Sequence, residues 1–129
     1  MIADTGPIIA WLNADDQHHA WAVDLARFRP WFTLESCLAE AVWNLRHPRK
    51  VAALVELGLV VVAPLDAKDW VRIAELAVKF ADHPIDLVDF AVVRLSEKFR
   101  REKIATVDEE HFSMLRRFRS ERLPLWLPP

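Results

Sequence analysis

The first twelve residues, 1-MIADTGPIIAWL-12, decide the fold class because they join a buried strand to a helix across one carboxylate. The apolar stretch before Asp4 predicts a short strand. Gly6 and Pro7 begin a helix that runs to about Asn13, since proline suits the first helical position, where no N–H is needed. Asp4 therefore stands at the carboxyl end of a strand, where open α/β sheets bind their ligands.

The rest of the chain repeats this alternation of apolar strands and amphipathic helices. It predicts an α/β fold: a single domain over residues 1–129, with a central, parallel, twisted sheet of about five strands and helices on both faces. The apolar run at 59–65 is typical of a fully buried parallel strand. Further strands are predicted at 31–34, 103–108 and 123–127, and helices at 15–29, 36–46, 48–58, 66–81, 85–101 and 109–118.

The composition excludes several classes of protein. Of the 129 residues, 53% are hydrophobic and 28% are charged, which is typical of a globular domain and not of a disordered chain. No apolar run approaches the roughly 18 residues that span a bilayer, and no signal peptide is evident. Cys37 is the only cysteine and cannot form an internal disulfide. These features predict a cytoplasmic protein without a membrane segment.

Charge is unevenly distributed along the chain. Residues 1–93 carry 8 Lys and Arg against 13 Asp and Glu, whereas residues 94–129 carry 9 against 6. This asymmetry is consistent with an acidic site beside a basic flank. Ordinary solvated helix surface explains it equally well.

A polar stripe runs along the predicted helix 36–46, which is otherwise apolar nearly all round and is expected to be buried on most sides. Ser36, Glu40 and Asn44 recur at every fourth position and share one face. A carboxylate among core residues is costly unless it is paired or binds a metal. The alternative is that the stripe is the solvent face of an amphipathic helix.

The predicted helix 85–101 also carries unexpected acids. Asp86 and Asp89 lie in its first turns, where the helix dipole favours negative charge. A capping role explains Asp86 well. It explains Asp89 poorly, because Val88 and Phe90 flank that carboxylate.

Four acids can therefore meet at one end of the sheet: Asp4 and Asp108 after strands, Glu40 and Asp89 on helices. Such carboxylates repel one another unless a cation holds them together. Oxygen ligands suit Mg²⁺ or Mn²⁺, and no Cys/His cluster suits zinc. This arrangement favours metal-assisted hydrolysis of a phosphodiester, in which one or two ions activate a water.

The chain resembles the PIN-domain ribonucleases, and among them the small VapC-type toxins of toxin–antitoxin pairs. The resemblance covers essentially the whole chain. Each motif is weak alone, and the four together in this order are fairly specific. The motifs are IADTGPIIAWL, TLESCLAEAVWNL, PIDLVDFAVVRLSEK and IATVDEEHF.

The resemblance implies a role for each matching residue. Asp4, Glu40 and Asp89 become metal ligands, and Asp108 becomes a further acidic ligand. Asp86 occupies a position that is acidic in part of the family. Thr5 and Thr106 match hydroxyls that orient the acids or contact phosphate, and the stripe residues Ser36 and Asn44 are further supporting candidates. Phe90 departs from the pattern, since the family usually has a small residue there.

The implied function is a Mg²⁺- or Mn²⁺-dependent endoribonuclease that acts as a toxin. Its partners would be an RNA substrate, a cognate antitoxin protein and a second copy in a homodimer. One alternative is a non-catalytic PIN-like module that binds RNA or protein. Another is a phosphoacceptor receiver domain, which needs an Asp after the third strand and a Lys after the fifth; the sequence argues against it.

Basic and aromatic residues offer weaker indications of RNA binding. Arg46, Arg49 and Lys50 follow the Glu40 helix and suit phosphate contact, or simply a solvated turn. The six tryptophans and seven phenylalanines are mostly expected in the core. Exposed ones would suit a base-stacking platform or a protein interface.

Overall fold

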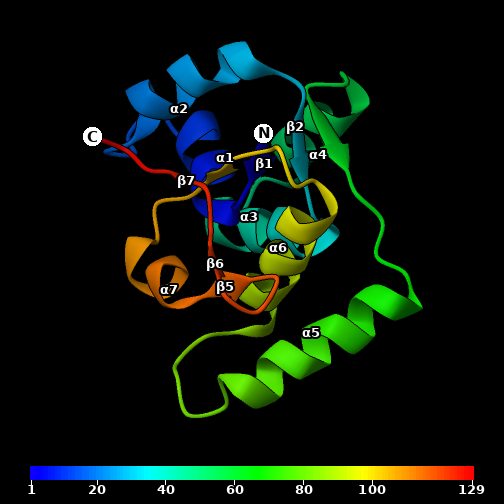
Figure 1. Ribbon diagram of the computed structural model, residues 1–129. Coiled ribbons are helices and arrows are strands. Elements are labelled where there is room, and N and C mark those ends of the chain that lie inside the picture. Colours follow the sequence, from blue (N-terminus) through cyan, green and yellow to red (C-terminus); the bar gives the residue numbers. More distant parts are fainter.

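A computed structural model describes all 129 residues and contains a five-stranded parallel sheet in the order β3-β2-β1-β4-β7 (Figure 1). This confirms the predicted α/β class. The strands are β1 (Ile2–Ala3), β2 (Trp31–Thr33), β3 (Val60–Val62), β4 (Ile104–Ala105) and β7 (Leu125–Trp126), with a hairpin of β5 (Arg116–Arg117) and β6 (Glu121–Arg122). The helices are α1 (Thr5–Leu12), α2 (His19–Leu25), a 3₁₀ turn (Ala26–Phe28), α3 (Glu35–Leu45), α4 (Pro48–Glu56), α5 (Ala67–Lys79), α6 (Leu87–Lys98) and α7 (Glu109–Met114).

The order of the strands reverses at β1. The chain moves from β1 to β2 and β3 on one side, and then crosses back to β4 on the other side of β1. Right-handed crossovers that leave in opposite directions carry their helices to opposite faces. The helix contacts accordingly fall into two groups, α1 to α4 and α5 with α6. The carboxyl ends of β1 and β4 therefore border the crevice in which α/β sheets bind ligands.

The register of β1 and β4 places two polar residues side by side. Ala3 pairs with Ala105, so the next residues, Asp4 and Thr106, lie opposite each other. The Asp4 N–H donates to the Ala105 carbonyl over 3.0 Å, which continues the ladder one residue further. Because paired residues point to the same face of a sheet, the side chains of Asp4 and Thr106 meet.

Local signals set several helix boundaries as predicted. Asp66 and Asp69 form a reciprocal capping box at the start of α5, and the Asp86 carboxylate accepts the Asp89 N–H over 3.1 Å at the start of α6. Gly58 follows α4 with a φ of 72°, a conformation that glycine adopts without a Cβ clash.

The predicted helix at 15–29 is wrong at both ends. The carboxamide oxygen of Asn13 accepts the Asp15 N–H over 3.0 Å, and the Asp16 carboxylate accepts the His18 N–H over 2.8 Å. Such side-chain bonds offer the backbone a turn in place of a helix, and α2 begins only at His19. The chain beyond Leu25 tightens into a 3₁₀ turn.

The predicted helix at 109–118 is also wrong beyond Met114, where the chain forms the β5–β6 hairpin. Arg117 is buried, and its guanidinium donates to the Ser96 hydroxyl over 3.0 Å and to Glu121 over 3.0 Å. A buried guanidinium needs several acceptors. An extended segment reaches them on α6, and Phe118, with a φ of 46°, turns the chain back.

Two predictions of burial are wrong. The strand predicted at 59–65 shortens to β3, which is an edge strand with Val61 41% exposed. On α3 only Cys37 and Ala41 are buried, while Trp43 is 71% exposed. The physical reason is that α3 packs against α1 and α4, which leaves its outer face to solvent.

Candidate active site

Asp4 stands at the centre of the acidic cluster. The residue is 7% exposed, and its side chain makes no capping bond to α1. The Thr106 hydroxyl instead donates to the Asp4 carboxylate over 2.9 Å and accepts the Asp108 N–H over 3.0 Å. Burial raises the pKa of Asp4 to about 6, and the nearby charges of Glu40 and Asp108 add to this effect.

Glu40 reaches the cluster from α3. The Thr5 hydroxyl donates to its carboxylate over 2.9 Å, and Thr5 directly follows Asp4 in the chain. Glu40 and Asn44 are exposed and Ser36 is half-buried, so the polar stripe faces solvent. The reading of Glu40 as a carboxylate buried among core residues is therefore wrong, although its charge lies close enough to act on Asp4.

Asp89 enters the cluster from α6. It is 8% exposed, and burial raises its pKa to about 7, with further contributions from the charges of Asp86, Asp4 and Asp108. Asp86 is exposed and caps the helix, as predicted. Phe90 points into the core, where its ring lies 6.3 Å from that of Phe80 at the end of α5.

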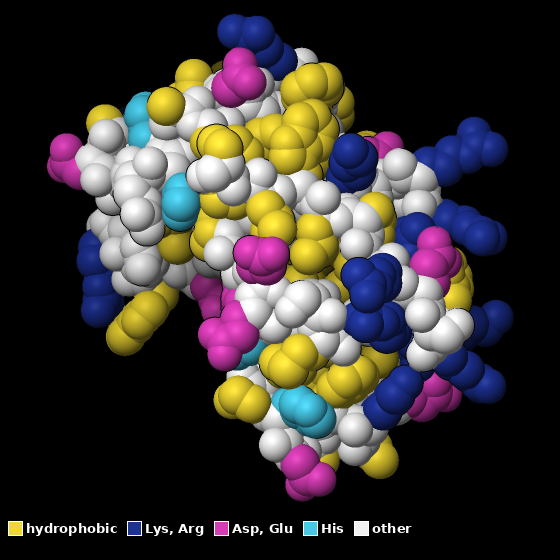
Figure 2. All heavy atoms as spheres, turned by 60° about the vertical axis from the view of Figure 1, so that its left-hand side comes forward, with side chains coloured by type: hydrophobic (Ala, Val, Ile, Leu, Met, Phe, Trp, Pro, Cys, Tyr) yellow, Lys and Arg dark blue, Asp and Glu magenta, His cyan; other side chains and the backbone are white.

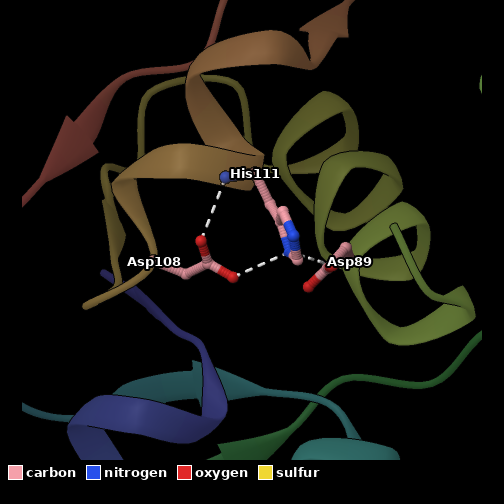
Figure 3. A group of neighbouring side chains, drawn as sticks. All are labelled: Asp89, Asp108 and His111. Atoms are coloured by element: carbon pink, nitrogen blue, oxygen red, sulfur yellow. Dashed lines mark hydrogen bonds and ion pairs between the residues drawn. The ribbon is translucent and has the colours of Figure 1, made fainter. Parts of the chain in front are cut away.

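His111 joins the acids without having been expected there (Figure 3). Asp108 caps α7 by accepting the His111 N–H over 3.0 Å. The imidazole lies between two carboxylates: its Nδ1 is 2.9 Å from an Asp108 oxygen and 3.5 Å from an Asp89 oxygen. The spacing of three residues after Asp108, at the start of a helix, was the one signal in the sequence for this contact.

Asp69 shows how this protein neutralises a buried carboxylate elsewhere. Burial alone favours its neutral form, yet Lys98 and Arg94, each 2.8 Å away, hold the pKa of Asp69 well below its usual range. No Lys or Arg pairs with Asp4 or Asp89, and their pKa values move in the opposite direction. The acidic cluster thus lacks the cation that a buried carboxylate normally has.

The donor atoms fit a divalent metal ion. One atom each from Asp89, Asp108 and His111 lie within 4.8 Å of one another. Asp4 is close enough to Asp89, Asp108 and Glu40 for their charges to act on one another. This set is rich in oxygen, with a single imidazole, and contains no thiolate. Hard divalent ions such as Mg²⁺ and Mn²⁺ prefer the carboxylate oxygens that make up most of this set.

The remaining candidates from the sequence lie on α3, on α4 and in the turn between these helices. The Arg46 guanidinium carbon is 4.0 Å from the Trp43 ring centroid, and the Lys50 ammonium donates to the Leu12 carbonyl over 3.1 Å. Arg49 is exposed. Ser36 lines an apolar groove of about 560 Å³ between α3, α5 and α6.

The strand ends argue against the receiver alternative. β3 ends at Val62 and is followed by Ala63 and Pro64, so the third strand has no acceptor aspartate. β7, the fifth strand of the sheet, is followed by Leu127 and not by lysine.

Comparisons with known proteins agree with this fold. Ribonuclease VapC26 of Mycobacterium tuberculosis is 29% identical over 125 residues, which cover 90% of this chain and 92% of that protein. The crystal structure of VapC20 from the same organism, described as a Sarcin-Ricin loop cleaving toxin, matches the fold with a TM-score of 0.66 at 23% identity, over 80% of this chain and 85% of that one. The sequence model of the PIN domain matches residues 1–117. The resemblance found in the four motifs is confirmed, and this chain belongs to the PIN-domain family.

Proposed function

We propose that this protein is a divalent-metal-dependent endoribonuclease and the toxin of a toxin–antitoxin pair. The observation that carries the proposal is the cluster at the β1–β4 crevice, in which two buried carboxylates have raised pKa values and no Lys or Arg partner. Membership of the PIN-domain family and similarity to a protein named a ribonuclease support the same activity.

Each acid has a role in this proposal. Asp4, Glu40 and Asp89 would hold the ion, with Mg²⁺ or Mn²⁺ as the expected metal, and Asp108 would add a further acidic ligand. Asp86 contributes charge mainly as the cap of α6. When bound, the ion polarises the phosphodiester and lowers the pKa of the attacking water.

Two threonine hydroxyls orient the acids, and the raised pKa values of two acids link metal binding to the loss of protons. Thr106 orients the Asp4 carboxylate, and Thr5 orients that of Glu40. Because the pKa values of Asp4 and Asp89 lie near neutrality, these groups would release the protons they hold on binding a cation. The site holds one imidazole, not a pair, so hydrolysis is expected to leave 5′-phosphate and 3′-hydroxyl ends.

Cleavage of single-stranded RNA tests the proposal. With Mg²⁺ present, Asp4→Asn and Asp89→Asn should each cut at least about 100-fold more slowly than the unchanged protein, because each substitution removes charge that would hold the ion. EDTA should stop cleavage because it removes the ion itself. Asp24→Asn is the matched control, since Asp24 is exposed on α2 and pairs only with Arg27.

Three outcomes would contradict the nuclease assignment. Cleavage that persists in EDTA would exclude a metal-dependent reaction. Wild-type rates in both variants would exclude the acidic cluster. RNA binding without cleavage by the unchanged protein would favour the alternative of a non-catalytic PIN-like module.

The toxin role has its own test. Induced expression of the unchanged chain should arrest bacterial growth, whereas Asp89→Asn should not, because the arrest depends on cleavage. Co-expression of a small protein encoded directly upstream should restore growth if that protein is the antitoxin. Equal toxicity of both chains would contradict the proposal.

The proposal extends to a homodimeric, cytoplasmic protein whose single domain covers residues 1–129. The sheet supports this domain boundary, since β7 at its edge lies beyond residue 117, where the family match ends. Exposed apolar residues on α5 support self-association: Trp70, Val71 and Val78 are 48%, 63% and 78% exposed. Light scattering at micromolar concentration should give twice the 14.9 kDa chain mass.

A further inference from the structure

Trp43 is a large aromatic side chain that the fold leaves in solvent next to the acids. It lies on the outer face of α3 and is 71% exposed. Single exposed apolar residues are common and carry no meaning by themselves. Trp43, however, lines a cavity of about 520 Å³ whose other walls include Thr5 and Glu40. The indole therefore borders the same opening as two residues of the acidic cluster.

Arg46 lies over the Trp43 ring. The chain leaves α3 at Arg46 with a φ of 55°, and the guanidinium carbon lies 4.0 Å from the ring centroid. A cation over an indole face is attracted by the ring electrons, which limits how far both side chains move. The result is an exposed aromatic surface held beside a positive charge.

We propose that Trp43 is a stacking platform for an unpaired base of the RNA, next to the nucleotide whose phosphate is cut. This deepens the proposed function and rests on it. Trp43 follows Glu40 by three residues on α3, so the two side chains are neighbours on the helix surface. A base is a flat ring that stacks on an indole whatever its identity, provided that it is not paired in a duplex.

The charges around Trp43 favour RNA over a protein as the occupant. Arg46 stands over the ring, and Arg49 is exposed in the first turn of α4, three residues further along the chain. Guanidinium groups bind phosphate through several N–H donors. The cavity also continues to Glu40, so a strand that is bound at the acids passes the indole. The platform thus offers a ring for the base and cations for the backbone.

Binding of a fluorescein-labelled 12-nucleotide single-stranded RNA, measured by anisotropy in EDTA, tests the platform separately from cleavage. Trp43→Leu should weaken binding by about 10-fold or more, and Trp43→Phe should restore most of it, because loss of one stacked base typically has this effect. Phe28→Leu is the control, since Phe28 is 53% exposed but packs on Trp126. The slope of the logarithm of the RNA-binding constant against the logarithm of the salt concentration should become less steep by about 0.7 in Arg46→Gln. It should stay unchanged in Trp43→Leu.

An abasic scan of the same RNA identifies the stacked base. At one position, removal of the base should weaken binding to the unchanged protein and have no further effect on Trp43→Leu. In cleavage assays, the loss in Trp43→Leu should fall mainly on KM.

Four results would overturn the platform. In the first, Trp43→Leu binds RNA as tightly as the unchanged protein; in the second, no abasic position has an effect that depends on Trp43. In the third, Trp43→Leu lowers kcat and leaves KM unchanged. In the fourth, Trp43→Leu changes the molecular mass of the protein in solution and leaves RNA affinity unchanged. The last would make the surface a protein interface. If the protein cleaves RNA but its RNA affinity does not depend on Trp43, only the stacking proposal is refuted. If RNA affinity depends on Trp43 but the protein does not cleave RNA, only the nuclease proposal is refuted.

Discussion

Gly6 shows how one missing side chain positions the acids. It lies in the first turn of α1 and packs against Val107, the residue between Thr106 and Asp108. A Cβ atom at Gly6 would lie 2.5 Å from a Val107 methyl carbon, which is closer than two non-bonded carbon atoms can approach. Val107 has a stiff, β-branched side chain, so the backbone that carries Thr106 and Asp108 would have to shift.

Gly6→Ala should therefore slow RNA cleavage about 10-fold or more. The loss of stability should be small, because alanine favours a helix over glycine by up to about 1 kcal/mol. Adding Val107→Ala to the same chain should restore most of the activity by removing the clash. Rates and urea denaturation of the single and double variants measure both effects.

Gly58 provides the control for this pair. A Cβ there meets nothing within 4 Å, but its φ of 72° strains any other residue. Gly58→Ala should thus lose stability and keep its cleavage rate. If the double variant Gly6→Ala with Val107→Ala cleaved RNA as slowly as Gly6→Ala alone, the clash with Val107 would not be the cause of the slower cleavage.

At the scale of elements, a network of ion pairs connects α5 to α6, the helix that carries Asp89 and is capped by Asp86. Asp69 bonds to Arg94 and Lys98, and Glu97 bonds to Arg72 over 3.0 Å and accepts the Phe118 N–H. The same network holds the β5–β6 hairpin against α6. Two helices that pack in this way cannot slide without breaking buried charge pairs.

Asp69→Asn should lower the free energy of unfolding by about 3 kcal/mol at pH 7, because Arg94 and Lys98 lose a buried partner. The pKa of Asp69 lies below its unfolded value, so its ion pairs stabilise the fold above about pH 4 and this contribution is lost at lower pH. The difference in free energy of unfolding between the unchanged protein and Asp69→Asn, measured by urea denaturation, should therefore become smaller as the pH falls below 4.

Glu75→Gln is the matched control on α5. Glu75 forms only an exposed pair with Arg72 over 3.3 Å, and such pairs contribute less than about 1 kcal/mol. An equal effect of both substitutions would contradict the role of the buried network.

At the scale of the whole molecule, charge is separated in space as well as along the chain. Figure 2 shows Lys and Arg side chains most densely along the right-hand side of this face, while acidic side chains lie near its middle and at several places on its edge. The excess of positive charge at 94–129 includes the exposed residues Arg100, Arg101 and Lys103. No helix has both the length and the apolar character needed to cross a bilayer.

The acidic cluster should make the stability of the metal-free protein depend on pH. Asp4 and Asp89 have folded pKa values of about 6 and 7, above the unfolded value near 4. Between pH 4 and 7 the folded state holds more protons than the unfolded state, so these groups lower the free energy of unfolding as the pH rises. Mg²⁺ or Mn²⁺ should reverse this loss, and should raise the Tm more at pH 7.5 than at pH 5.5.

Thermal unfolding of the unchanged protein and of Asp4→Asn, with and without the ion, measures this dependence. The variant should show a weaker fall of Tm with pH and a smaller shift on addition of metal. A metal shift that is equal at both pH values, or equal in both proteins, would contradict the assignment of the site.

The sequence by itself determined the α/β class, most element positions, and the acids at strand and helix ends. These features depend on contacts between near neighbours: the caps at Asp66 and Asp86 bond within one turn, and Gly58 satisfies a local backbone angle. Asp4 and Asp108 follow strands whose carboxyl ends any parallel sheet brings to one edge.

Only the tertiary structure decided how these residues meet. The exposure of Glu40 and Trp43 depends on what packs against α3, and the hairpin at Arg117 depends on acceptors about twenty residues away on α6. His111 reaches Asp89 because α7 lies against α6. Each outcome is a balance of burial and hydrogen bonding between segments far apart in the chain, and local sequence patterns do not contain it.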